Sequence, residues 1–259
     1  MLPLRDRLPR RRAPVVNYAL ILVNVLAFLW ERAELALGYA PHRLLLEWGL
    51  VPSLLVAHPV EEASTVLTSM FLHDPTGWAH IGGNMLFLWI FGDNVEDALG
   101  RGRYLLFYLL SGLAAAAAQI LIDPGSRVPM VGASGAIAGV LAAYVTLYPR
   151  APITVLNPIP ILWIFFGIFL ELPAWLIIGE FFVMNLFYAL GYLGGHAPGG
   201  VAFFAHLGGF VAGLFLVRGF VGGARGRDHD RWTGFRPPPR RPPAGYGYPP
   251  PPAHRPWDG

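Results

Sequence analysis

The stretch RYLLFYLLSGLAAAAAQILI, residues 103–122, is 20 residues long and carries no charge after its first residue. A helix needs about 20 predominantly apolar residues to cross the hydrocarbon core of a bilayer. Similar runs recur along the chain, in which 54% of the residues are apolar and only 14% are charged. The helices of a soluble domain would carry polar stripes, which whole segments of this chain lack. The composition therefore predicts an all-α, polytopic membrane protein.

Six segments of this kind are expected to span the membrane. They cover approximately residues 15–33, 80–99, 103–122, 133–149, 173–193 and 201–221. The long first extracytoplasmic loop, residues 34–79, contains apolar clusters, so we expect short helices lying on the membrane surface there. The basic start of the chain resembles the n-region of a signal peptide. No convincing small-residue cleavage site follows it, so we interpret residues 15–33 as the first span.

Residues 153–171, ITVLNPIPILWIFFGIFLE, are apolar enough to form a further span. However, Pro152, Pro158 and Pro160 crowd the first half of this segment. Proline removes a backbone donor and disfavours helix in the residue before it, so a complete spanning helix is not expected. We interpret the segment as re-entrant or interfacial.

The arginines predict the orientation of the chain. With six spans, 16 of the 19 arginines fall on the side that holds both chain ends, and the positive-inside rule makes that side cytoplasmic. We expect a basic cytoplasmic N-terminus (residues 1–14), a membrane domain (15–222) and a disordered Pro/Arg-rich cytoplasmic tail (223–259). The modest net charge of +3 is interpreted as a topology signal, and nucleic acid is not an expected partner.

Polar motifs lie at or near the start of the second, fourth and sixth predicted spans. They are His80 and Asn84 in HIGGN, Ser134 in VGASG, and His206 in AHLGG. These three spans run from outside to inside, so their N-terminal ends lie on one face. At 1.5 Å per residue, His206 lies roughly 8–9 Å below the start of its helix, and the short fourth span can place Ser134 at a similar depth. The motifs are therefore expected to meet in the outer half of the membrane.

Nucleophilic catalysis requires these residue types. A serine hydroxyl is a poor nucleophile until a base takes its proton, and neutral imidazole is the usual base near pH 7. Gly132 and Gly135 beside Ser134 allow a substrate backbone to approach closely. The unpaired N–H groups at a helix start suit a developing oxyanion. His80 and Asn84 lie four residues apart on one helical face, where both can donate to it.

Each residue alone has a plainer interpretation. Small residues are common at helix contacts in membranes, and a buried histidine or asparagine is more often structural. The combination at matched depth favours a functional site, since intramembrane polar residues are costly. Glu180, within the fifth predicted span, is open to two interpretations: part of an ion pathway, or a protonated or hydrogen-bonded side chain. We favour the second.

The quoted motifs resemble those of the bacterial rhomboid family. The similar segments are TSMFLHDPTGWAHIGGNMLFLWIFGDNVEDALGRGRYLLFYLLSG (68–112), VPMVGASGAIAG (128–139) and AHLGGFVAG (205–213), within a similarity covering about residues 15–222. The resemblance implies a six-helix bundle that cleaves transmembrane or membrane-adjacent segments of other membrane proteins, without a cofactor. By motif, it implies that Ser134 is the nucleophile and His206 the general base. His80, Asn84 and the backbone N–H of Ser134 would form the oxyanion hole.

Further positions match the family and two depart from it. Glu96 and Gly100 fit its E-x-x-x-G motif, for which a structural role is expected. Gly209 and Gly213 have the small-x-x-x-small spacing that lets the sixth helix approach the fourth closely. Ser64-Thr65 stand where many members carry Trp-Arg. Ala138 stands where some members have an aromatic side chain stacked on the histidine.

Other classes of function are less favoured. The chain has no cysteine and no H-E-x-x-H motif, which argues against a cysteine nucleophile and a metalloprotease, and no metal site is predicted. A transporter would show an internal repeat, which is not evident. The remaining alternative is a catalytically silent rhomboid relative that binds membrane-protein clients. The expected location is the cell (inner) membrane, with the active site opening to the extracytoplasmic side.

Overall fold

The computed structural model describes residues 1–193 and 202–221, so the predicted C-terminal tail lies outside the described residues. The six predicted spans coincide, within three residues at each end, with long helices. These are α1 (Val15–Ala36), α5 (Ala79–Leu99), α6 (Arg101–Ile122), α7 (Ser134–Leu147), α9 (Ala174–Leu193) and α10 (Phe203–Phe220). Within the described residues, α6, α9 and α10 are long and apolar enough to cross a membrane, and α7 is a shorter apolar helix.

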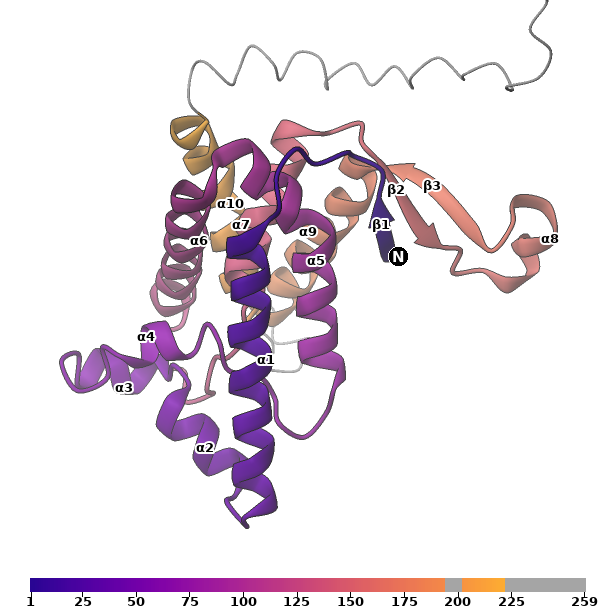
Figure 1. Ribbon diagram of the computed structural model, residues 1–259. Helices are drawn as coiled ribbons and strands as arrows, with labels where there is room; N and C mark the ends of the chain where they lie inside the picture. The colour runs from indigo at the N-terminus through magenta and orange to yellow at the C-terminus, as the bar shows by residue number, and fades with distance from the viewer. Residues whose placement is uncertain (194–201, 222–259) are drawn as a thin grey trace, which may run out of the picture.

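Helix α7 forms the centre of the bundle and packs against α5, α6 and α10 (Figure 1). Small residues allow this close packing. A Cβ on Gly209 of α10 would overlap the carbonyl oxygen of Gly135, and one on Gly213 would lie 2.5 Å from the carbonyl oxygen of Gly139. The backbones of α7 and α10 therefore touch, as the small-residue spacing predicts.

Helices α5 and α6 are joined by Gly100 alone, which has a φ of +83°. A side chain at this φ would be strained, so glycine permits the abrupt reversal between the two helices. One turn earlier, the carboxylate of Glu96 accepts hydrogen bonds from the backbone N–H groups of Val16 (3.2 Å) and Asn17 (2.7 Å). Glu96 thus satisfies donors at the start of α1 that have no partner within the helix.

Three short helices follow α1: α2 (Pro41–Trp48), α3 (Pro52–Ala57) and α4 (Thr65–Thr68). They lie at one end of the bundle (Figure 1). Short helices are therefore present where the sequence predicts them, and their position on the membrane surface stays a prediction. The loop before α7 is tied to them. Leu50 pairs with Met130 through two backbone hydrogen bonds of 3.0 and 2.7 Å, and the N–H of Gly132 donates to the carbonyl of Ser69.

A small sheet lies at the opposite end of the bundle (Figure 1), so the all-α prediction is wrong in this part of the chain. Strand β2 (Pro152–Leu156) pairs antiparallel with β1 (Leu2–Asp6) and with β3 (Phe169–Pro173). Between β2 and β3 lie the 3₁₀ turn η1 (Pro160–Leu162) and the short helix α8 (Trp163–Phe166).

The segment 153–171 thus forms most of a β-hairpin, which the sequence did not predict, and its re-entrant or interfacial placement stays a prediction. The prolines prevent a spanning helix, as expected. The β-branched side chains of Ile153 and Val155 are fully buried and suit a strand. The N-terminus, expected only as a basic segment, contributes β1.

Polar contacts hold β1 against the helices at this end, which we call the sheet end. The Asp6 carboxylate accepts hydrogen bonds from the Asn94 amide (2.6 Å) and the Tyr144 hydroxyl (2.7 Å). Burial raises the pKa of Asp6 from 3.8 to about 7, against the opposing effect of the Tyr144 hydrogen bond. Asp6 therefore docks the strand onto α5 and α7.

Two acidic residues, Glu180 in the predicted fifth span and Glu171 just before it, also have partners. Glu180 accepts hydrogen bonds from the Met1 amino group at 2.8 and 2.9 Å, and Glu171 forms an ion pair with Arg7. The hydrogen-bonded interpretation of Glu180 agrees with this contact.

Candidate active site

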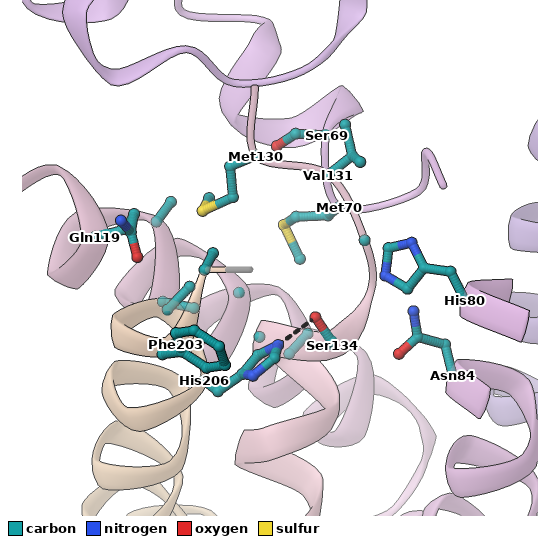
Figure 2. Close-up of a pocket in the computed structure, with 18 of the residues that line it drawn as sticks. Ser69, Met70, His80, Asn84, Gln119, Met130, Val131, Ser134, Phe203 and His206 are labelled. Carbon is teal, nitrogen blue, oxygen red and sulfur yellow. Dashed lines mark hydrogen bonds between the residues drawn. The ribbon is translucent and has the colours of Figure 1, made fainter. Parts of the chain in front are cut away.

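Ser134 and His206 lie side by side where α7 meets α10. Ser134 is the first residue of α7, and His206 lies in the first turn of α10. The Oγ of Ser134 and the Nε2 of His206 are 2.7 Å apart, which is hydrogen-bonding distance (Figure 2). The contact depends on the close approach of the two backbones at Gly135 and Gly209.

The other ring nitrogen of His206 also has a partner. Its Nδ1 lies 2.6 Å from the Oδ1 of Asn185 on α9. The ring of Phe181, one turn earlier on α9, lies 5.9 Å from the imidazole centroid. Asn185 was not among the residues predicted from the sequence. The available signal was an uncharged polar residue inside a largely apolar span.

His80 and Asn84 approach Ser134 from α5, on the side opposite His206 (Figure 2). A Cβ on Gly132 would lie 2.9 Å from the Nε2 of His80, and the φ of +125° at Gly132 also favours glycine. The Asn84 Nδ2 is buried, and among the described residues it has no hydrogen-bond partner. A buried amide donor without a partner is costly, so this group is available to a ligand.

The tautomer of His80 follows from its second nitrogen. The backbone N–H of Asp74 donates to His80 Nδ1 at 3.3 Å, so the ring proton of the neutral histidine is on Nε2, toward Gly132. The loop that carries Asp74 is anchored to α1, because the Glu31 carboxylate accepts the backbone N–H of His73 at 3.0 and 3.2 Å.

His73, which was not among the predicted site residues, lies beside the site. Its ring meets that of His80 edge-on at 5.1 Å. Burial, with a smaller effect of the neighbouring His80, lowers the pKa of His73 from 6.5 to about 4. The ring is therefore neutral at physiological pH and adds no positive charge next to His80.

A cavity of about 720 Å³ is lined by the four predicted site residues, Ser134, His206, His80 and Asn84. Apolar side chains form much of its remaining wall, including Met70, Met130 and Phe203 (Figure 2). Such a mixture of apolar wall and a few converging polar groups is typical of a ligand site. Within the described ranges, no group of three or more His, Asp or Glu side chains could hold a metal ion.

Two departures from the family pattern have structural counterparts. Ala138 is fully buried one turn after Ser134 and brings no ring to His206. The aromatic contact comes instead from Phe181 of α9. At Ser64-Thr65, the Thr65 hydroxyl donates to the carbonyl of Glu62 and closes the turn before α4.

Comparison with known proteins agrees with this arrangement. The family model for the rhomboid domain matches residues 60–222. Rhomboid protease GluP of Bacillus subtilis is 36% identical over 139 residues, which cover 53% of this chain and 26% of that protein. Rhomboid protein 1, mitochondrial, of Saccharomyces cerevisiae is 31% identical over 149 residues, 55% of this chain and 40% of that protein. The chain thus spans less than half the length of these relatives.

The match covers the motifs that meet in the cavity, and the apolar helices accord with a multi-pass membrane protein. The chain belongs to the rhomboid family.

Proposed function

We propose that this chain is an intramembrane serine endopeptidase that cleaves transmembrane or membrane-adjacent segments of other membrane proteins. The observation that carries the proposal is the 2.7 Å contact between the Ser134 Oγ and the His206 Nε2 inside a walled cavity. A histidine at this distance is placed to accept the serine proton. The similarity to a relative named a rhomboid protease supports the same reaction.

The reaction follows from the positions of these atoms. The Nε2 of His206 takes the proton as the Ser134 Oγ bonds to the substrate carbonyl carbon. The same Nε2 then protonates the leaving nitrogen as the peptide C–N bond breaks. Water, with His206 again as base, hydrolyses the resulting acyl ester and restores Ser134.

Donors around Ser134 would bind the oxyanion that forms during acylation of Ser134 and again during hydrolysis of the acyl ester. They are the Ser134 backbone N–H at the start of α7, the Nε2–H of His80 and the amide of Asn84. The buried Asn84 Nδ2 has no partner among the described residues, which supports this role. Preorganised donors of this kind stabilise charge only as it develops, so they lower the barrier.

The proposal places the chain in the cell (inner) membrane, which it would cross six times, with both termini in the cytoplasm. Arg5, Arg7 and Arg10 lie in or next to β1 at the sheet end, where the positive-inside rule favours the cytoplasm. The cavity borders α2 at the other end of the bundle, so it would open to the extracytoplasmic side (Figure 1). Substrates would be membrane proteins that reach the cavity from the bilayer.

The test is cleavage of a reporter transmembrane substrate in liposomes. Ser134→Ala and His206→Ala should each lower kcat/KM by about 10³-fold or more, because each removes a reacting group. Ser111→Ala is the matched control. Ser111 is a fully buried serine of the neighbouring helix α6, and its Oγ has no partner within the described ranges. It should cleave as well as wild type.

Persistent cleavage by both active-site variants would contradict the proposed mechanism. A wild-type protein that is folded but cleaves none of several substrates, while still binding them, would favour the client-binding alternative.

A further inference from the structure

His206 is held at both ring nitrogens by groups from two different helices. Its Nε2 meets Ser134 of α7 at 2.7 Å, and its Nδ1 meets the Asn185 Oδ1 of α9 at 2.6 Å. Asn185 is only 8% exposed, and its neighbours along α9, residues 181–184 and 186–187, are all apolar. A polar side chain in such a place needs hydrogen bonds to offset the loss of hydration.

The orientation of the Asn185 amide follows from its second contact. Its Nδ2 donates to the backbone carbonyl of Phe181 at 2.8 Å. A carbonyl can only accept, so the amide atom that faces His206 is the oxygen. The Asn185 Oδ1 can only accept as well, and the proton of the neutral imidazole is therefore on Nδ1.

This tautomer is the one that the reaction requires. With the proton on Nδ1, the Nε2 presents its lone pair to the Ser134 hydroxyl and can accept the serine proton. The alternative tautomer would place an N–H against the serine and an unprotonated nitrogen against the Asn185 oxygen. Two acceptors would then face each other at 2.6 Å, which is unfavourable.

The same helix also limits rotation of the ring. Phe181 lies one turn before Asn185, so both side chains face α10, and its ring contacts the imidazole at 5.9 Å with a tilt of 42°. Ala138 on α7 brings no ring to His206. The orientation of His206 therefore depends on α9.

We propose that Asn185 is a positioning residue that completes a Ser134–His206–Asn185 hydrogen-bond chain and commits His206 to the Nδ1–H tautomer. This inference rests on the proposed function. An amide orients the ring as the carboxylate of a serine-protease triad does, but it brings no charge to stabilise the imidazolium.

The first test is Asn185→Leu, which has a similar size and no acceptor. We expect kcat to fall about 10- to 100-fold at an unchanged KM, because the ring samples the unproductive tautomer and orientation while substrate binding remains. The rate at which a fluorophosphonate labels Ser134 should fall by a similar factor. That reaction reports the reactivity of the serine without any substrate segment.

Asn185→Asp separates positioning from a merely structural role. The aspartate keeps the acceptor and adds a negative charge that favours the imidazolium. At neutral pH, the labelling rate should therefore equal or exceed that of wild type. The acid limb of the pH–rate profile should move to higher pH. A residue that only packs would not move this limb.

Asn24→Leu is the matched control. Asn24 is also buried in a long helix, α1, where its Nδ2 donates to the Leu20 carbonyl at 2.7 Å, and it does not line the cavity. Its kcat per folded molecule should equal that of wild type, with folding checked by thermal unfolding. If Asn185→Leu keeps the wild-type kcat and labelling rate, the role of Asn185 is overturned and the proposed function is not. The same holds if Asn24→Leu loses as much kcat as Asn185→Leu. A wild-type protein that neither cleaves nor labels would overturn the proposed function as well.

Discussion

The two ends of the bundle use polar groups in opposite ways. At the sheet end, Asp6 accepts hydrogen bonds from Asn94 and Tyr144, and its strand β1 packs against α5. At the other end, which we call the cavity end, the Asn84 amide donor is buried without a partner among the described residues and faces a cavity of about 720 Å³. Satisfied polar groups stabilise a fold, whereas unsatisfied donors in a cavity are kept for a ligand. Two asparagines of the same helix therefore have different tasks.

The sharpest comparison uses those two asparagines of α5. Asn84→Leu should lower kcat about 10²- to 10³-fold, the usual cost of removing one oxyanion donor, without lowering stability. Asn94→Leu should lower the free energy of unfolding by about 1–3 kcal/mol, because it removes one of the two donors to Asp6, and should leave kcat of the folded protein unchanged. Cleavage kinetics and chemical denaturation check the pair. Similar effects of both variants on both measurements would contradict the division between the two ends.

The α7–α10 contact can be broken without altering any polar group. Gly209→Ala places a methyl group against the Gly135 carbonyl and should separate the helices that carry Ser134 and His206. We expect a loss of stability of about 1–3 kcal/mol from overpacking, and at least a tenfold loss of kcat. Gly219→Ala on the same helix is the control, since its Cβ would meet nothing within 4 Å. Wild-type cleavage by Gly209→Ala would show that the close approach is dispensable.

The sheet end should respond to pH through Asp6. Because the pKa of Asp6 rises from 3.8 to about 7 on folding, the folded chain binds this proton more tightly than the unfolded chain between these values. The free energy of unfolding should therefore fall as pH rises from about 4 to 7, through this group. Thermal unfolding between pH 5 and 8 measures it, and Asp6→Asn should flatten the dependence. An unchanged slope in Asp6→Asn would remove Asp6 as its source.

The smallest effect concerns the hairpin between β2 and β3, which stays a predicted interfacial segment. Its tip exposes Ile164 (81%) and Phe165 (75%). The chain has no cysteine, so Ile164→Cys gives a single labelling site. An environment-sensitive dye there should shift to the blue in liposomes and be quenched by nitroxide lipids. Gly125→Cys, in the loop between α6 and α7 at the cavity end, is the comparison site. A water-like spectrum at Ile164→Cys would contradict the interfacial placement.

Local signals predicted much of this fold. Apolar runs located the long helices to within three residues at each end. The sheet was missed because β1 and β2 lie about 150 residues apart, and no local pattern indicates which strands pair. The direction of the predicted spans and the depth of each motif correctly predicted that Ser134 and His206 lie in the same region of the bundle. The contact with Asn185 was missed because it depends on how α9 is rotated against α10, which the side-chain pattern of α9 alone does not specify.

The pairing of β1 with β2 sets an order of events during synthesis. Residues 2–6 leave the ribosome before their partners at 152–156, which follow only after α1, α5, α6 and α7 have been made. At 5–20 residues per second, β1 waits roughly 7–30 s for its neighbour. Asp6 also needs Asn94 and Tyr144 in place before it can dock. The strand can therefore close only on an assembled α5–α7 pair, so its docking marks the completion of the first part of the bundle.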